Sequence, residues 1–422
     1  MHTLRNVSVA VLAVTMLTFS GAVQAQQTTI NFLSAERETT FAPVIESFEK
    51  LHPDIKVVHQ SVPFDDLNAA MESRIGQGDT SIDVIAADTP RIPAFASKGY
   101  FLNLDDRADA ITEAVPNPVD LEQVSYNGSI FAYPMWTSTQ LLFFNRDLLK
   151  AGDIAPPSAD PAERITWSGL IEKAVAAQEA GAKWGFMFEQ VDRYYQLQML
   201  FESAGGGSGL TGDENLTVDI TNDAWIKTAE WYGKTYADGI SPRGVTPEQA
   251  ADLFVNGELA FYVTGPWAFD RLNSVEGLDF GVALVPYFEG GKPVTPTGSW
   301  AISLNPHSEK LEAARMFAEY ATLNAEGAYL TVSANPLPPT NAEAYKTYAA
   351  IIAEMTPKVG PAIDIITHES QNTAIGRPRS KGYVAYETIM NRAFSDIRNG
   401  SDVKSTLETA QKALERQLNR LK

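Results

Sequence analysis

The sequence predicts an α/β protein in which two portions of about equal size are followed by a helical tail. Short apolar runs typical of buried strands alternate with segments whose apolar residues recur at the spacing of an amphipathic helix. Strands separated by helices imply parallel sheets covered on both faces. The length of 422 residues exceeds that of one domain, about 100–200 residues. Beyond the proline-rich residues 336–339 the pattern is only helical.

The first portion alternates strand and helix from its start. Its first strand, residues 30–33, is followed by a helix at residues 40–51 that ends before Pro53. The further elements predicted in this portion are a strand at 55–58, a helix at 65–75, a strand at 82–86 and a helix at 91–97. The pair Asn127-Gly128 between two β-rich runs then indicates a tight hairpin.

The second portion continues the alternation. Its predicted elements are a strand at 141–144, a helix at 166–179, a strand at 184–188, helices at 192–203 and 247–256, a strand at 259–263, a helix opened by Pro266, and strands at 282–285 and 301–304. The last helix of the tail has six apolar residues on one face: Val403, Leu407, Ala410, Leu414, Leu418 and Leu421.

Residues 1–25 have the three parts of a secretory signal peptide. Arg5 supplies a positive charge, residues 7–19 are almost wholly apolar, and residues 23–25 offer the small side chains that a signal peptidase needs. A membrane anchor is the alternative, but the apolar run is shorter than the ~20 residues that a bilayer requires. We expect cleavage after Ala25 and a mature protein that is exported to the periplasm and is not inserted in the membrane.

The composition argues against several classes of partner and chemistry. There are 52 acidic and 33 basic side chains, a formal net charge of −19 and no cysteine. Without cysteine there is no disulfide scaffold, thiol nucleophile, iron–sulfur cluster or Cys-ligated zinc site. Nucleic acids and anionic membranes attract clusters of Lys and Arg, so neither is an expected partner. The absence of cysteine also suits an oxidising periplasm.

No motif for a metal, a cofactor or a hydrolytic triad stands out. The histidines after residue 25 (His52, His59, His307 and His368) form no HxH or HExxH pair, and no GxSxG occurs. Residues 207–212 match GxGxxG but follow a predicted helix and run into a strand-like segment, so no helix N-terminus is available for a pyrophosphate. We expect a loop there and no cofactor.

Carboxylate pairs keep one enzymatic alternative open. A secreted glycoside hydrolase would use two carboxylates, one as acid and one as nucleophile or base. Neighbouring acids occur at residues 65–66 and 105–106 and at Glu36 and Glu38, but nothing in the sequence marks any two of them as a catalytic pair.

Three tryptophans fall where predicted strands meet loops: Trp136, Trp267 and Trp300. The face of an indole ring suits the apolar C–H face of a sugar, and carboxylates and arginine suit its hydroxyls. Burial in a core or an interface is the alternative for each of them. The residues alone leave both interpretations open.

Several segments resemble the family 1 extracellular solute-binding proteins, the periplasmic sugar receptors of ABC importers. The segments that carry the resemblance are 48–57, 81–85 with 96–105, 127–134 with 141–145, and 254–260 with 265–267. Each segment is weak by itself, but their order and spacing are similar to those of the family over nearly the whole mature chain.

The resemblance implies the two-lobed type II fold of periplasmic binding proteins, with a ligand cleft between lobes joined by crossing strands. By analogy, the N-lobe is 26–137 with a return segment at 290–335, and the C-lobe is 138–289 with the helical tail 336–422. The implied function is capture of a mono- or oligosaccharide by hinge closure and its delivery to an ABC permease. The implied protein is a monomer and not an enzyme.

The resemblance also assigns candidate site residues. Sugar receptors of the family have an acid after the first strand and another at the end of the third, which match Glu36 and Asp88, with Asp65 a looser match. Their ring-stacking tryptophans match Trp267 and Trp300.

One departure from the family bears on the ligand. Many disaccharide-binding members have an aspartate where this chain has Ser138, and a late arginine matches Arg377, with Arg379 as the alternative. With Arg37 also a candidate, an anionic sugar or a glycerol phosphate derivative is the alternative ligand. The acids Glu36 and Asp88 argue against an anion, and we expect a neutral saccharide. The candidate ligand-binding residues are Glu36, Arg37, Asp65, Asp88, Trp136, Ser138, Trp267, Gly298, Trp300 and Arg377.

Overall fold

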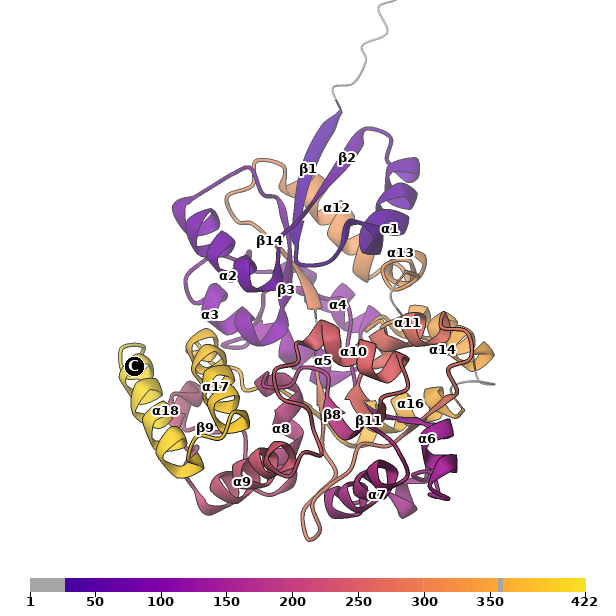
Figure 1. The fold of residues 1–422 in the computed structure, drawn as a ribbon. Coiled ribbons are helices and arrows are strands. Elements are labelled where there is room, and N and C mark those ends of the chain that lie inside the picture. Colours follow the sequence, from indigo (N-terminus) through magenta and orange to yellow (C-terminus); the bar gives the residue numbers. More distant parts are fainter. Residues whose placement is uncertain (1–26, 299, 335, 356–359) are drawn as a thin grey trace, which may run out of the picture.

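The computed structural model describes residues 27–298, 300–334, 336–355 and 360–422. The predicted signal peptide, residues 1–25, lies outside the described residues. Figure 1 shows two lobes, an indigo upper lobe and a lower lobe that carries the yellow C-terminal helices. Each lobe is built around its own sheet, so the predicted two-part α/β organisation is confirmed.

The upper lobe, which we call the N-lobe, contains a five-stranded sheet in the order β2-β1-β3-β14-β6. The strands are β1 (Thr28–Ser34), β2 (Ile55–Ser61), β3 (Val84–Asp88), β6 (Tyr133–Pro134) and β14 (Trp300–Leu304). β1 pairs in parallel with β2 and β3, as the alternation of strands and helices predicts. β14 returns from far along the chain and pairs antiparallel to β3, with Trp300 opposite Asp88.

Helices cover this sheet. They are α1 (Glu38–Leu51), α2 (Phe64–Ser73), α3 (Ile92–Ala96), α4 (Ala108–Ala114), α5 (Pro118–Gln123), α12 (Leu311–Thr322) and α13 (Ala325–Leu330). The apolar stripe of α1 faces inward, and the ring of Phe41 contacts Phe32 of β1 at 4.8 Å between centroids. The ring of Phe317 in α12 also contacts Phe32, at 5.6 Å between centroids. Two helices distant in sequence therefore share one core over β1.

The lower lobe, which we call the C-lobe, has a four-stranded sheet in the order β12-β7-β11-β8. The strands are β7 (Leu141–Asn145), β8 (Trp184–Phe188), β11 (Leu259–Thr264) and β12 (Phe280–Ala283). Successive residues of β7 alternate between two cores: Leu141 and Phe143 belong to the core that continues into the N-lobe, whereas Leu142 and Phe144 belong to the core beneath the C-terminal helices.

The C-lobe helices are α6 (Arg146–Ala151), α7 (Trp167–Glu179), α8 (Tyr194–Ser203), α9 (Asp223–Ala237), α10 (Pro247–Val255), α11 (Phe269–Asn273), α14 (Ala342–Glu354), α16 (Ala362–Asn372), α17 (Tyr383–Arg398) and α18 (Val403–Leu418). The tail helices α17 and α18 pack on each other and on α9 (Figure 1). The predicted stripe of α18 buries Leu407, Leu414 and Leu418, whereas Leu421, beyond the helix, is 37% exposed. No helix within the described ranges is long and apolar enough to cross a membrane.

Two local predictions are confirmed. Asn127 and Gly128 both have positive φ, 51° and 81°, and connect the hairpin strands β4 (Ser125–Tyr126) and β5 (Ser129–Ile130). Residues 207–212 lead into the small hairpin of β9 (Leu210–Thr211) and β10 (Thr217–Val218). Residues 207–209 of the GxGxxG match are a loop and residues 210–211 are strand β9, so the match is not a dinucleotide motif.

Three segments cross between the lobes and lie side by side. The first joins β6 to β7, the second contains β13 (Thr295–Thr297), and the third joins α13 to α14. The Thr137 hydroxyl of the first segment is 2.8 Å from that of Thr297 in the second. The backbone N–H of Thr137 donates to the carbonyl of Pro338 in the third. β13 also pairs with β15 (Ala374–Gly376) of the tail.

Candidate ligand-binding cleft

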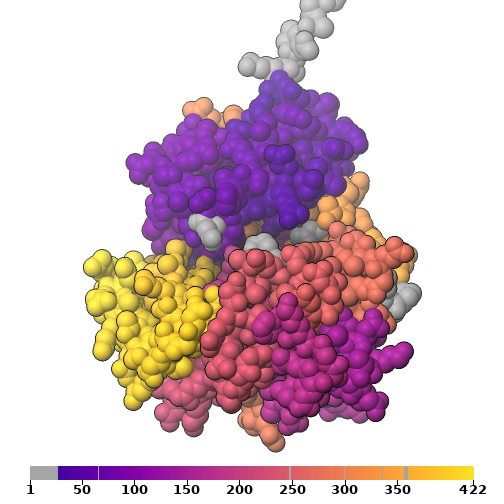
Figure 2. Space-filling model, in the orientation of Figure 1, coloured from indigo at the N-terminus to yellow at the C-terminus, as the bar shows by residue number. Residues whose placement is uncertain are grey.

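A cavity of about 630 Å³ lies between the two lobes, within the range of small-molecule sites. Figure 2 shows the indigo part and the magenta-to-yellow part meeting along a line that crosses this face of the molecule. The cavity is lined by Ala35, Glu36, Phe64, Asn68, Asp88, Arg91, Gln190, Arg193, Tyr195, Trp267, Gly298, Trp300, Leu337, Arg377, Glu387, Thr388 and Asn391. The structure thus brings together six predicted site residues: Glu36, Asp88, Trp267, Gly298, Trp300 and Arg377.

The N-lobe side of the cavity is formed where the strands end. Glu36 follows β1, and Asp88 is the last residue of β3. Trp300 is the first residue of the antiparallel β14 and is paired with Asp88 in the sheet. The carboxyl ends of parallel strands are the usual ligand edge of an α/β sheet. Sheet topology therefore explains why these residues, distant in sequence, meet.

Asp88 and Arg377 form a buried ion pair across the cavity. Arg377 donates two hydrogen bonds to Asp88, of 3.0 and 2.5 Å, and both side chains are at least 94% buried. Arg91 also contacts the Asp88 carboxylate and reaches Glu387 of α17 at 2.5 Å. Two predicted site residues are thus each other's partners, within a network that ties the N-lobe to the tail helices.

Gly298 supports this network by its backbone. Its φ of +81° favours glycine, and a Cβ there would lie 2.9 Å from the Gln123 side chain. Its carbonyl oxygen accepts from Arg377 at 3.5 Å and from the Ser138 hydroxyl at 3.5 Å. Ser138 is 1% exposed, does not line the cavity and hydrogen-bonds the hydroxyl of Tyr195. Ser138 therefore lies behind the Tyr195 ring, over which the Arg377 guanidinium stacks at 4.6 Å.

Trp267 is fixed by a buried carboxylate. Its indole Nε1 donates to Glu189 at 2.8 Å, and the Thr264 hydroxyl donates to the same oxygen at 2.7 Å. Burial raises the pKa of Glu189. A Cβ at Gly265 would lie 2.0 Å from the Trp267 ring, so only glycine allows the indole to fold over this position. The ring orientation at the cavity is therefore set by Glu189 and Gly265.

Trp300 meets a cluster that the sequence did not reveal. Its ring packs edge-on against Phe64 at 5.9 Å. The guanidinium groups of Arg91 and Arg193 lie over the same Phe64 ring, at 4.7 and 5.4 Å from its centroid. Phe64 and Arg193 each stand at the start of a helix that follows a strand, close to the strand–loop junctions at which the tryptophans were predicted. The same rule could have found them.

The prediction that Trp136 faces the ligand is wrong. Trp136 is 1% exposed and does not line the cavity. Its ring stacks on Phe41 at 5.5 Å, and its Nε1 donates to the Thr331 hydroxyl at 2.7 Å. Trp136 is therefore not available to a sugar, because its ring is already packed and its Nε1 already has a hydrogen-bond acceptor.

Two other predicted residues do not join the observed cavity. Arg37 is exposed, occupies the N-cap position of α1 and does not line the cavity. Asp65 belongs to α2, and its side chain lies outside the described part of the structure. The arginines that line the cavity are instead Arg91, Arg193 and Arg377.

Glu36 has a perturbed carboxyl group. Burial raises its pKa from 4.5 to about 7, against a smaller lowering by the Arg37 charge. The folded state thus holds the proton more tightly than the unfolded chain. The stability contributed by this difference is fully present below about pH 4.5 and is lost as the pH rises to about 7.

We expect Glu36→Gln to flatten the fall in unfolding free energy between pH 4.5 and 7. Denaturant unfolding of both proteins at a series of pH values measures the difference between their unfolding free energies. This difference removes the contributions of other groups, such as Asp120, whose pKa is also raised by burial. The exposed neighbour Glu38 provides the control variant Glu38→Gln. The same pH profile in wild type and Glu36→Gln would contradict the assignment.

The described residues contain no group of three or more His, Asp or Glu side chains placed to hold a metal ion. Of the adjacent acids, Asp105 accepts the backbone N–H of Ile130 at 2.9 Å and the Asn103 amide at 3.0 Å. These bonds lower its pKa and give it a structural use at a loop. The contacts of Asp105 therefore do not identify it as one of the two catalytic carboxylates of a glycoside hydrolase.

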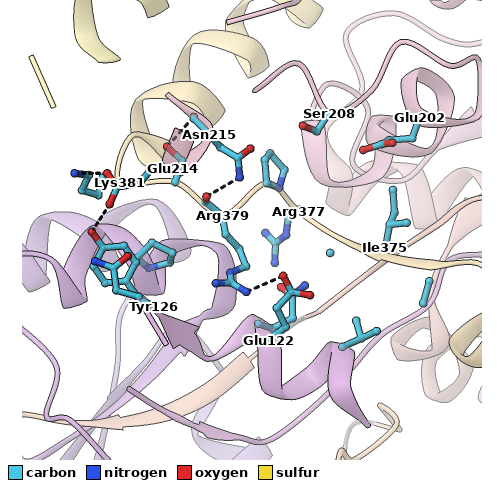
Figure 3. A pocket seen from close by; sticks show the side chains of 18 residues that line it. Glu122, Tyr126, Glu202, Ser208, Glu214, Asn215, Ile375, Arg377, Arg379 and Lys381 are labelled. Carbon is cyan, nitrogen blue, oxygen red and sulfur yellow. Dashed lines mark hydrogen bonds and ion pairs between the residues drawn. The ribbon is translucent and has the colours of Figure 1, made fainter. Parts of the chain in front are cut away.

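A second cavity, of about 550 Å³, lies between α5 and β4 of the N-lobe and residues 374–381 of the tail (Figure 3). Its cations already have acidic partners: Arg379 is 3.0 Å from Glu122, and Lys381 is 2.5 Å from Glu214. Tyr126 donates to the same Glu214 at 3.1 Å. The Arg379–Glu122 and Tyr126–Glu214 contacts connect the lobes, and the tryptophans predicted for the site do not line this cavity. The aromatic cavity is therefore the candidate site.

Two lobes that enclose an aromatic and charged cavity define a protein that binds a small solute between them. The pattern of the bacterial extracellular solute-binding proteins matches residues 34–328, and the chain belongs to this family.

Individual relatives agree with this assignment. The maltodextrin-binding protein MdxE of Bacillus subtilis is 24% identical over 321 residues, 74% of this chain and 73% of that protein. The galactooligosaccharide-binding protein of Bacillus subtilis is 24% identical over 298 residues, 68% and 66% of the two chains. The GacH receptor of Streptomyces glaucescens, solved unliganded and with acarbose, has a similar fold with a TM-score of 0.78 at 24% identity, covering 93% of this chain and 99% of that one.

Proposed function

We propose that the protein captures a mono- or oligosaccharide in the cavity between its lobes and delivers it unchanged to the membrane subunits of an ABC importer. The observation that carries the proposal is that Trp267 and Trp300 line one cavity together with the carboxyl groups of Glu36 and Asp88. Indole faces bury the apolar faces of sugar rings, and carboxylates accept hydrogen bonds from hydroxyl groups. The relatives named as maltodextrin-binding and galactooligosaccharide-binding proteins support the same ligand class.

The proposal includes closure of the lobes around the ligand. The moving bodies are residues 26–137 with 290–335, and residues 138–289 with 336–422. The three crossing segments are the hinge, because they are the covalent links between the sheets of the two lobes. Hinge closure of this kind sequesters a ligand and creates the surface that a permease recognises.

The remaining parts of the proposal concern the protein in the cell. Residues 1–25 direct export, and the mature protein acts in the periplasm as a monomer. It binds no nucleic acid, needs no cofactor and does not alter its ligand. A glycoside hydrolase is the competing function, and it differs in one measurable outcome, the release of products.

The first experiment is thermal unfolding of the protein without residues 1–25 in the presence of a panel of saccharides, with chromatography of the recovered sugar. A ligand at 1,000 times its Kd stabilises the native state by about 4 kcal/mol, which raises Tm by several degrees. A rise in Tm with the sugar recovered intact supports the proposal. Cleaved sugar contradicts it in favour of the hydrolase, and no rise with any saccharide contradicts the ligand class.

Trp267→Ala is expected to weaken binding of the saccharide found in that panel by about 1–3 kcal/mol, the scale of a buried aromatic contact. Titration calorimetry measures the loss. Trp267→Phe is the matched control, because it keeps an aromatic face but loses the hydrogen bond to Glu189, and it should retain part of the affinity. Unchanged affinity in the alanine variant would remove Trp267 from the site.

A further inference from the structure

Arg193 differs from the other arginines of the cavity in having no acidic partner. Arg91 is paired with Asp88 and Glu387, and Arg377 is paired with Asp88. Among the described residues, no carboxylate lies within 4.0 Å of the Arg193 guanidinium, whose recorded contact is the face of Phe64 at 5.4 Å. Arg193 is partly exposed and lines the cavity. A permanent cation therefore faces the ligand space, with no carboxylate partner among the side chains that the structure describes.

The acids near Arg193 are engaged elsewhere. Glu189 is buried, accepts from Trp267 and Thr264, and has a raised pKa because of its burial. Asp192 forms an ion pair of 3.2 Å with Arg398. Glu36, on the opposite lobe, has its pKa raised to about 7 by burial. The Arg193 charge opposes the effect of burial on the pKa of Glu189 and of Asp192, but neither carboxylate lies within 4.0 Å of the guanidinium.

The paired arginines also retain unused donors. The Nε atoms of Arg91 and Arg377 are buried and have no hydrogen-bond partner within the described parts of the chain. Both residues line the same cavity as Arg193. In the neighbouring cavity of Figure 3, Arg379 and Lys381 are likewise paired with glutamates, and the buried Nε of Arg379 also has no hydrogen-bond partner within the described parts of the chain. What distinguishes the aromatic cavity is therefore Arg193, which has no carboxylate within 4.0 Å among the described residues.

We propose that the saccharide carries an acidic group, a carboxylate or a sulfate ester, and that Arg193 binds this group. This inference rests on the proposed function. The planar guanidinium presents paired N–H donors that match carboxylate and sulfate oxygens. Stacking on Phe64 holds the guanidinium plane in place, while Trp267 and Trp300 contact the sugar rings. Arg193 thus determines specificity for the acidic over the neutral form of the sugar.

The test compares pairs of sugars that differ only in the acidic group: galacturonic acid with galactose, glucuronic acid with glucose, their short oligomers, and sulfated with unsulfated galactose. Calorimetry at low and high salt is expected to show the acidic member binding about 10- to 100-fold more tightly, the value of a charge-assisted hydrogen bond. The preference should decrease with salt. Uronates and sulfated sugars as separate arms identify which acid is bound.

Variants locate the preference. Arg193→Gln should remove most of the preference, because both the charge and the paired N–H donors are lost, while Arg193→Lys should keep part of it because the charge remains. Arg37→Gln, at an exposed arginine outside the cavity, is the matched control and should leave the preference for the acidic sugar in place. Thermal unfolding without sugar checks that each variant is folded.

The outcomes separate this inference from the proposed function. Equal or tighter binding of the neutral member overturns the acidic-group inference and leaves saccharide capture intact. An Arg193→Gln variant that weakens both members equally also overturns it. If no sugar of either kind binds, the proposed function fails, and the inference fails with it.

Discussion

Glu369→Ala is expected to lower the free energy of unfolding by about 3–5 kcal/mol, the cost of leaving one charge of a buried ion pair without its partner. Arg164 donates to the Glu369 carboxylate at 2.7 and 3.1 Å, and their side chains are 3% and 0% exposed. The same carboxylate accepts the backbone N–H of Val285, and Arg164 donates to the carbonyl of Val285. The pair therefore connects α16 to the chain after β12.

Denaturant unfolding measures this loss. Glu343→Ala is the matched control, because Glu343 pairs with Lys346 on the surface, where an ion pair is worth about 0–1 kcal/mol. The double replacement Arg164→Met with Glu369→Leu removes both charges and should recover much of the stability. A loss in Glu369→Ala no greater than in Glu343→Ala would contradict the structural role.

Trp136→Ala is expected to lower the free energy of unfolding by about 3–5 kcal/mol, the usual cost of removing a large aromatic side chain from a core. Its ring is fully packed against Phe41, and the substitution also leaves the Thr331 hydroxyl without its indole donor. Because Trp136 does not line the cavity, affinity for a saccharide should change little when it is measured well below Tm.

Denaturant unfolding and calorimetry on the same variant distinguish the two roles. Trp136→Phe is the control that keeps an aromatic ring and should recover part of the stability. A variant with wild-type stability and lost affinity would return Trp136 to the ligand site. Trp267→Ala should show the reverse pattern, so the two substitutions form a matched pair at two strand–loop junctions.

Much of the fold could be predicted because its signals are local. The apolar stripes of α1 and α18, the strand runs of β7 and β11 and the Asn127-Gly128 turn depend on residues a few positions apart. Strand ends were less well defined: β12 is Phe280–Ala283, two residues earlier than the apolar run at 282–285 suggests. Leu284 and Val285 are buried although they lie beyond the end of β12, so the apolar run extends past the strand.

The site was harder to predict because it depends on contacts between distant segments. Trp136 and Trp300 both stand at strand–loop junctions, and only the packing of α1 against the sheet shows that one of them is covered. Likewise, the sequence suggests that Arg377 binds a ligand, and only the fold shows that Asp88 is its partner. Arg193 shows the converse, since a missing partner cannot be recognised before the neighbours are known.

The position of β14 in the N-lobe sheet has a consequence for how the chain reaches its native state. β14 lies between β3 and β6, yet more than 160 residues separate it from β6 in the sequence. While the chain emerges from the ribosome, the edge of β3 has no partner until the C-lobe strands have been made. An open strand edge invites pairing with other chains. The N-lobe sheet therefore cannot be completed before the chain up to β14 has been synthesised.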